Sequence, residues 1–281
     1  MDDLNEKAAR RRKIAHAIEI VILIVLFICF IFPFILVIIN VFKTKADITS
    51  NPLALIGEHG FTIKNFPEAM RKMNFLRSFG NSALITIVST IFTILIASMT
   101  AFVIVRNKWK ACGALFGLMI ASMVIPFQVL MIPLVSLYGG VLGMLNHRAT
   151  LIFMHVGFSL SMATFMFHGA IFTNVPLALE EAATIDGASP WQRFSRVTIP
   201  LLMPAIRINV VTNIIGSLSV FDIIMSLTEG GPGYSTESLS IYIMRMCYGS
   251  RTGYSTAVAL ILFFIILIPV LISMYLTREK E

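Results

Sequence analysis

The chain has 281 residues, of which 57% are hydrophobic and 13% charged, and its formal net charge is +7 at pH 7. The charged fraction is about half that of an average soluble domain, and the hydrophobic residues come in blocks about twenty long, the helix length that crosses about 30 Å of hydrocarbon. This composition excludes a soluble globular protein and indicates a polytopic membrane protein.

Six hydrophobic blocks follow one another along the chain. Each is expected to be helical, because backbone amides in lipid must be satisfied within their own segment, and the alternation typical of barrel strands is absent. The sequence therefore predicts an all-α polytopic membrane protein with six transmembrane helices. These spans are expected at about 18–42, 81–105, 111–138, 149–172, 201–227 and 255–276.

The N-terminus carries a basic cluster, residues 7–13, directly before the first span. The span continues without a small-residue cleavage site, which indicates a retained helix rather than a signal peptide, and the cluster predicts a cytoplasmic N-terminus. Six spans return the C-terminus to the same side. Residues 1–17 are thus the expected cytoplasmic N-terminus, 18–277 the membrane domain with an inner loop at 173–200, and 278–281 the cytoplasmic tail.

Two prolines of the third predicted span and one acid of the fifth bear on how these spans are built. Pro126 and Pro133 are spaced two turns apart in the third span, and tolerated prolines are favoured over a designed hinge. Asp222 is the one acid well inside a span. An acid there is costly enough to indicate function or a specific pair, and we expect a structural bond near the outer end of the fifth span.

Motifs for catalysis and phosphate binding are absent. The sequence contains no GxxxxGK[ST], HExxH or GxSxG pattern, and the glycine-rich stretch 230–233 lacks the lysine of a phosphate loop, so a turn is expected there. The positive charge follows membrane topology and forms no patch interleaved with aromatics, which argues against nucleic acid as a partner. The chain is therefore expected to have no catalytic residues, no metal site and no cofactor of its own.

The inner loop 173–200 has internal helix signals. Pro176 begins one short helix and Gly187 ends it; Ser189 and Gln192 fit a capping box that starts a second short helix, which we expect to end near Val197 before Pro200. Small residues and acids on the first helix let another surface approach closely and form charge-assisted bonds. The loop is predicted to be a docking surface for a partner.

The same loop resembles the EAA motif of permease subunits in binding-protein-dependent ABC importers. The matching positions, in the spacing of that motif, are Glu181, Ala182, Ala183, Gly187 and the run from Val197 to Pro200. Val197 is a conservative departure, since isoleucine is commonest there.

The resemblance implies the type I ABC importer permease fold, with this loop as a coupling helix between the fourth and fifth spans. Glu181 would pair with a basic residue of a cytoplasmic ATPase, Gly187 would form the elbow, and Ala182, Ala183, Asp186 and Pro200 would complete the coupling site. ATP and Mg²⁺ would bind to two copies of that ATPase. A bacterial or archaeal inner or plasma membrane is the implied location.

Three further stretches narrow the resemblance to carbohydrate-uptake permeases of the maltose type: FTIKNFPEAM at 61–70, FGNSALIT at 79–86 and LTEGGPGYSTESL at 227–239. They imply an importer of sugar, and of oligosaccharide in particular, in which this chain forms half of the pathway. The implied partners are a second permease subunit in a heterodimer and an extracytoplasmic sugar-binding protein. Which half of the heterodimer the chain represents stays open.

A polar stripe on the fifth span is the candidate solute pathway. Its members fall within about a third of the helix circumference, and they fit either contact with sugar hydroxyls or the small and polar packing common between membrane helices. Gln128, and His155 with Ser159, are weaker candidates on the same logic. The stripe consists of Asn209, Thr212, Asn213, Gly216 and Ser217.

Other functions compete with the sugar importer. An ion-gradient-driven secondary transporter is suggested by Asp222 and the intramembrane histidines, although paired charges in corresponding spans are absent. An importer permease for a non-sugar solute, and a membrane scaffold that docks a cytoplasmic protein without transport, are the remaining alternatives.

Overall fold

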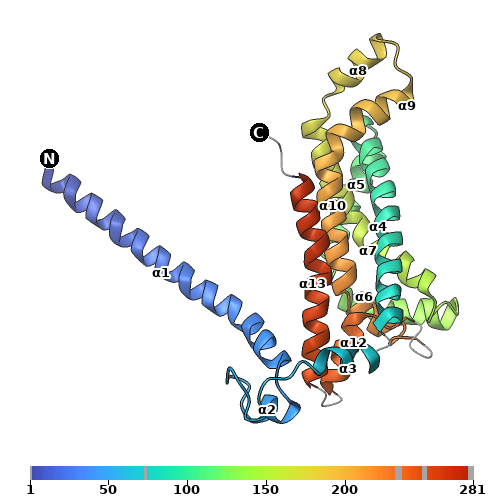
Figure 1. The fold of residues 1–281 in the computed structure, drawn as a ribbon. Coiled ribbons are helices and arrows are strands. Elements are labelled where there is room, and N and C mark those ends of the chain that lie inside the picture. Colours follow the sequence, from blue (N-terminus) through green and yellow to red (C-terminus); the bar gives the residue numbers. More distant parts are fainter. Residues whose placement is uncertain (1, 73–74, 232–235, 249–251, 278–281) are drawn as a thin grey trace. The chain divides into compact units, whose positions relative to one another are not determined.

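The computed structural model describes residues 2–72, 75–231, 236–248 and 252–277, and every regular element in these ranges is a helix (Figure 1). The first half of the chain contains α1 (Asp2–Val41), α2 (Lys45–Ser50), α3 (Asn65–Lys72), α4 (Phe75–Arg106), α5 (Lys110–Ser122), α6 (Phe127–Val135) and the π-helix η1 (Ser136–Val141). The second half contains α7 (Arg148–Asn174), α8 (Leu177–Ile185), α9 (Pro190–Arg193), the π-helix η2 (Phe194–Thr198), α10 (Ile199–Ser219), α11 (Asp222–Leu227), α12 (Leu239–Tyr248) and α13 (Thr252–Thr277).

Two compact units divide the chain, one comprising Met1–Ala69 with Met246–Leu260 and the other Met70–Arg245 with Ile261–Glu281. Five stretches are long and apolar enough to cross a membrane: Arg11–Val41, Phe75–Arg106, Arg148–Asn174, Pro190–Ser219 and Gly253–Ile272. The all-α prediction is confirmed for the described residues. The candidate membrane spans among them number six when the bent helix pair at the third predicted span counts as one span. The predicted tail 278–281 and residues 232–233 of the glycine-rich turn lie outside the described residues.

The third predicted span is broken rather than continuous. Its two halves, Lys110–Ser122 and Phe127–Val141, meet at a bend of 97°. Pro126 lies at the break as the N-cap of α6, where a missing N–H costs nothing because the first amides of a helix have no intrahelical partner. The expectation of a tolerated proline therefore holds for Pro133, inside α6, and is wrong for Pro126.

The fifth predicted span is shorter than expected, because α10 ends at Ser219 and Val220 is extended. Asp222 begins the separate short helix α11, where an acid in the first turn is favoured by the helix dipole. Its Oδ2 accepts a hydrogen bond from Gln128 Nε2 at 3.3 Å. Asp222 is therefore a helix-start residue with a side-chain partner and not an acid buried in a span.

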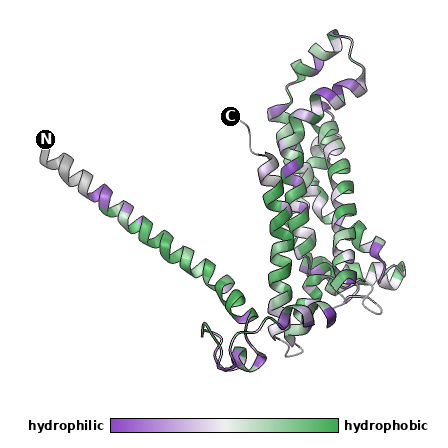
Figure 2. Ribbon diagram, viewed as in Figure 1, coloured by the Kyte–Doolittle hydropathy of each residue, from purple (hydrophilic) through white to green (hydrophobic). Residues whose placement is uncertain are grey.

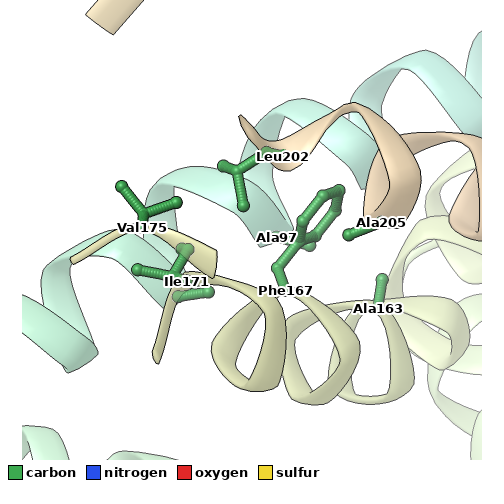
Figure 3. Packing of buried hydrophobic residues seen from close by; sticks show 8 residues of the cluster. Ala97, Ala163, Phe167, Ile171, Val175, Leu202 and Ala205 are labelled. Atoms are coloured by element: carbon green, nitrogen blue, oxygen red, sulfur yellow. The ribbon is translucent and has the colours of Figure 1, made fainter. Parts of the chain in front are cut away.

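The core of the second unit is the packing of α4, α7 and α10 against one another. Buried alanines on all three helices, Ala97, Ala163 and Ala205 among them, let the backbones approach closely. Phe167 is fully buried, and its ring extends toward α10 beside Ala97 (Figure 3). Hydrophobic residues predominate along these helices (Figure 2), and large apolar side chains such as Ile87, Phe165 and Ile208 are exposed, as expected where side chains meet lipid.

In the first unit, the segment after α1 is folded back onto the end of that helix. Lys43 is 1% exposed, and its Nζ donates to Asn40 Oδ1 and to the carbonyls of Asn51 and Pro52, each at 3.2 Å. Asn65 Nδ2 donates to the carbonyls of Val41 and Lys43. These bonds satisfy a buried cation with neutral acceptors and close the segment between α1 and α3.

The close approach of α4 and α7 predicts the effect of a larger side chain. Ala97→Leu should destabilise the protein by about 1–3 kcal/mol, because added methylenes in a packed core force strain. Met99→Leu, two residues along and 65% exposed, is the matched control and should have little effect. Thermal unfolding of the purified complex in mild detergent measures both, and equal melting temperatures would contradict the assigned packing.

Candidate functional site

Helices α8 and α9 project from one end of the second unit, opposite the end that contains α6 (Figure 1). Helix α8 spans Leu177–Ile185, as predicted from the sequence. Its end is a complete Schellman motif: Ala188 N–H donates to the Ala183 carbonyl at 2.9 Å, and Gly187 N–H to the Thr184 carbonyl at 3.1 Å. Gly187 has a φ of +77°, which confirms the elbow and explains why glycine stands there.

The second helix of the projection begins with the predicted capping box. Ser189 Oγ accepts from Gln192 N–H at 3.3 Å, and Gln192 Oε1 accepts from Ser189 N–H at 2.8 Å. The predicted end before Pro200 is wrong, since α9 continues through η2 into α10 without interruption. Pro200 therefore lies inside a continuous helix, directly after the wider π turn η2, where the backbone hydrogen-bond pattern is already altered.

The predicted coupling residues form the tip of this projection. Glu181, Ala182, Asp186 and Gly187 are exposed and Ala183 is half-buried, whereas Pro200 lies at the base. Two large apolar side chains that the sequence interpretation did not include, Ile185 and Trp191, are 87% and 71% exposed at the same tip. Exposed apolar groups beside acidic ones are typical of a protein-binding surface, and Figure 2 shows polar residues gathered along α9.

Two side-chain hydrogen bonds that were not expected from the sequence hold the projection in place. Arg193 Nη1 donates to Thr184 Oγ1 at 2.7 Å, which joins α9 to α8. Arg106 Nη2 donates to Glu180 Oε1 at 2.7 Å, which joins α8 to the last residue of α4. The loop after α4 therefore lies at the same end as α8 and α9. The sequence feature that could have pointed to the second contact is Glu180, a glutamate directly before Glu181.

A cavity of about 300 Å³ lies between α7 and α10. All five stripe residues line it, together with His155 and Ser159 from α7, so the structure brings the candidate pathway residues of two helices together. Gln128 does not line this cavity and instead bonds Asp222. The stripe residues on its wall are Asn209, Thr212, Asn213, Gly216 and Ser217.

The lining is uncharged and mixes polar side chains with apolar ones such as Phe158, Met162 and Met166. Among the described residues that form the wall, none is Lys, Arg, Asp or Glu. His155 Nδ1 lies 2.8 Å from the Leu151 carbonyl, so Nδ1 carries the hydrogen and Nε2 is an acceptor. Nε2 is buried and has no partner among the described residues. Asn209 and Asn213 each use one amide hydrogen on a carbonyl of their own helix.

Comparison with known proteins adds independent observations. A family model described as "Binding-protein-dependent transport system inner membrane component" matches residues 93–280. The probable starch degradation products transport system permease protein AmyC of Thermoanaerobacterium thermosulfurigenes is 31% identical over 257 residues, covering 92% of this chain and 90% of AmyC. AmyD, a second permease protein of that system and bacterium, is 34% identical over 113 residues, 40% of this chain and 39% of AmyD.

A similar solved structure is that of a bacterial alginate ABC transporter in complex with an alginate pentasaccharide-bound periplasmic protein. One of its chains aligns with a TM-score of 0.75 at 19% identity, covering 97% of this chain and 96% of that chain. The fold is therefore that of the membrane subunit of such a transporter, as predicted.

The elbow predicts a graded response at Gly187. A Cβ there would meet nothing within 4 Å, so the cost comes from the left-handed backbone alone: about 1–2 kcal/mol for Gly187→Val and less for Gly187→Asn, which tolerates that region. Faster tryptic cleavage after Arg193 in membrane vesicles would report the loosened elbow. Gly169→Ala, also in open space but at an ordinary φ, should leave the rate unchanged; an unchanged rate in Gly187→Val would contradict the strain.

Proposed function

Since the chain belongs to the family of binding-protein-dependent transport system inner membrane components, we propose that it is the transmembrane subunit of an ATP-driven oligosaccharide importer. It forms half of the translocation pathway and takes its mechanical input from a cytoplasmic ATPase. The observation that carries this proposal is the exposed tip of α8 and α9. There the Glu181 to Gly187 motif is held on a fixed elbow at the end of a membrane helix.

The tip is suited to transmit force. Ile185 and Trp191 supply apolar contact area to an ATPase groove, and Glu181 supplies a charge for a basic residue of that ATPase. The helix that starts at Pro190 runs unbroken to Ser219. A displacement of the tip therefore moves the fifth span and with it one wall of the cavity, as alternating access requires.

The cavity fits a neutral sugar. Its wall places hydroxyl and amide groups, such as those of Ser159 and Asn213, among apolar residues such as Phe158, a mixture that suits a solute rich in O–H groups. AmyC is named for starch degradation products, and the similar solved transporter for alginate. The uncharged wall favours uncharged oligosaccharides over an acidic polysaccharide such as alginate, because a buried carboxylate needs a partner.

The proposed assembly follows from the same relatives. AmyC and AmyD are two permease proteins of one system, which supports a second permease subunit beside this chain, and the alginate structure contains a periplasmic protein, which supports an extracytoplasmic sugar-binding protein. Two copies of an ATPase would bind ATP and Mg²⁺, so this chain is non-catalytic. We place it in a bacterial or archaeal inner or plasma membrane with both termini cytoplasmic, on the basis of the basic cluster at 7–13.

The ion-gradient alternative has less support. Asp222 lies in the first turn of α11 and bonds Gln128, and the described cavity wall contains no acid or fixed cation to carry a proton or ion.

Reversing the charge at the tip should uncouple import. Glu181→Lys is expected to abolish ATP-driven uptake and Glu181→Gln to weaken ATPase binding by roughly 10- to 100-fold, the scale of a charged hydrogen bond. The measurements are sugar uptake in proteoliposomes and co-purification of the ATPase. Glu58→Lys, on the exposed segment between α2 and α3, is the charge control. Normal uptake and normal ATPase binding in Glu181→Lys would refute the docking role.

Loss of cavity hydrogen bonds should weaken solute binding. Asn213→Leu and Ser159→Ala should each raise the sugar concentration for half-maximal uptake by about fivefold, the value of one net hydrogen bond. Ile215→Val, on the same helix and absent from the cavity wall, is the control. If the sugar concentration for half-maximal uptake is unchanged in both cavity variants, the stripe serves only in helix packing and the solute path lies elsewhere.

A further inference from the structure

Arg106 joins three elements at the inner end of the helix bundle. It is the last residue of α4, and its Nη2 lies 2.7 Å from Glu180 Oε1 and 2.8 Å from the Val175 carbonyl. Val175 caps α7, and Glu180 lies in the first turn of α8. One guanidinium group therefore connects the end of α4, the end of α7 and the start of α8.

The burial of this contact separates it from an ordinary surface ion pair. The side chains of Arg106 and Glu180 are only 17% and 13% exposed, whereas exposed pairs contribute little because solvent screens them. The Arg106 guanidinium also lies 5.6 Å from the ring centre of Phe102, within cation–π range. The Arg106 charge is favoured at a helix C-terminus, and the Glu180 charge near a helix N-terminus.

The backbone at this point needs a brace. Val175 leaves the helical region, and Pro176 has no N–H to continue the hydrogen bonds of α7. Helix α8 is thus attached to α7 through a two-residue joint with freedom to swing. On the α7 side, the joint is fixed because Ile171 and Val175 are buried in the same cluster as Ala97 and Ala101 of α4. On the α8 side, the described contact to α4 is the one that Arg106 makes with Glu180.

We propose that Arg106 and Glu180 are a positioning pair that fixes α8 to α4 and α7, so that force on the tip reaches these helices as well as α10. Movement of the tip then reaches the membrane helices by two routes. One is the continuous helix from α9 into α10; the other is the ion pair at the joint, which holds the α7 wall of the cavity to the same movement. This inference rests on the proposed coupling function, and it assigns residues outside the motif that the sequence resemblance covers.

A purely local role for the pair has a different consequence. If Arg106 and Glu180 served only to neutralise each other, replacing both by apolar residues would leave α8 in place, since a buried pair is often replaceable in this way. If the pair positions α8, the double variant Arg106→Met with Glu180→Leu should release it. The single variant Glu180→Ala should release it also, because it removes the acceptor and leaves the guanidinium with the Val175 carbonyl but no carboxylate.

The test measures position and coupling separately on the assembled complex. Spin labels at Asn107→Cys and Ala178→Cys, which is exposed on α8 and outside the coupling residues, report the distance from the end of α4 to α8 in a background with the three native cysteines replaced. The double variant should broaden that distance distribution, and uptake per ATP hydrolysed in proteoliposomes should fall by about tenfold, within the range known for residues that couple distant sites. Lys110→Gln, exposed at the start of α5 and outside the loop 173–200, is the charge control and should change neither the distance distribution nor uptake per ATP.

The two readings distinguish the possible failures. A wild-type distance distribution in the double variant overturns the positioning role. A broadened distribution with unchanged uptake per ATP overturns the claim that the pair transmits force. If the wild-type complex imports no oligosaccharide with ATP, the proposed function fails, while the distance measurement still decides whether the pair holds α8.

Discussion

The close packing of α4, α7 and α10 determines where the rest of the second unit can lie. Lipid tails are as apolar as these helices, so association depends on shape and on van der Waals contact rather than on a hydrophobic driving force. Buried alanines permit the approach, and Phe167 fills the space between the three helices. Toward one end this packing brings Arg106 to the start of α8; further along, the separation of α7 and α10 leaves the uncharged cavity.

The projection formed by α8 and α9 is rigid for local reasons and is mechanically connected for tertiary ones. Its elbow and caps are satisfied by hydrogen bonds between residues a few positions apart. Its connections to the membrane differ on the two sides. On one side the π turn η2 carries the helix past Pro200 into α10; on the other, a break at Val175 is bridged by an ion pair. The continuous helix into α10 transmits a displacement of the projection, and the ion pair holds the start of α8 in place.

Polar groups inside the bundle are satisfied only in part by their own helices. Asn209, Asn213 and Thr212 each donate to a carbonyl of α10, so that part of the cost of burial is met locally. Other buried polar atoms, Thr93 Oγ1 and His155 Nε2 among them, have no hydrogen-bond partner among the described residues. The charges of Arg106, Glu180 and Asp222 lie at helix ends, where the helix dipoles favour them.

The sequence by itself determined the helical class, the number of spans, the bounds of α8, the elbow at Gly187 and the capping box at Ser189. Each of these depends either on the demand of lipid for satisfied backbone groups or on hydrogen bonds between near neighbours, which composition and spacing reveal. Only the tertiary structure decided the 97° break at Pro126, the passage of the helix through Pro200, and the pairing of Arg106 with Glu180. A proline in a membrane helix is compatible with a break, a kink or continuation, and neighbouring helices select among them. Arg106 and Glu180 are 74 positions apart, and no local pattern specifies which distant side chain a guanidinium will meet.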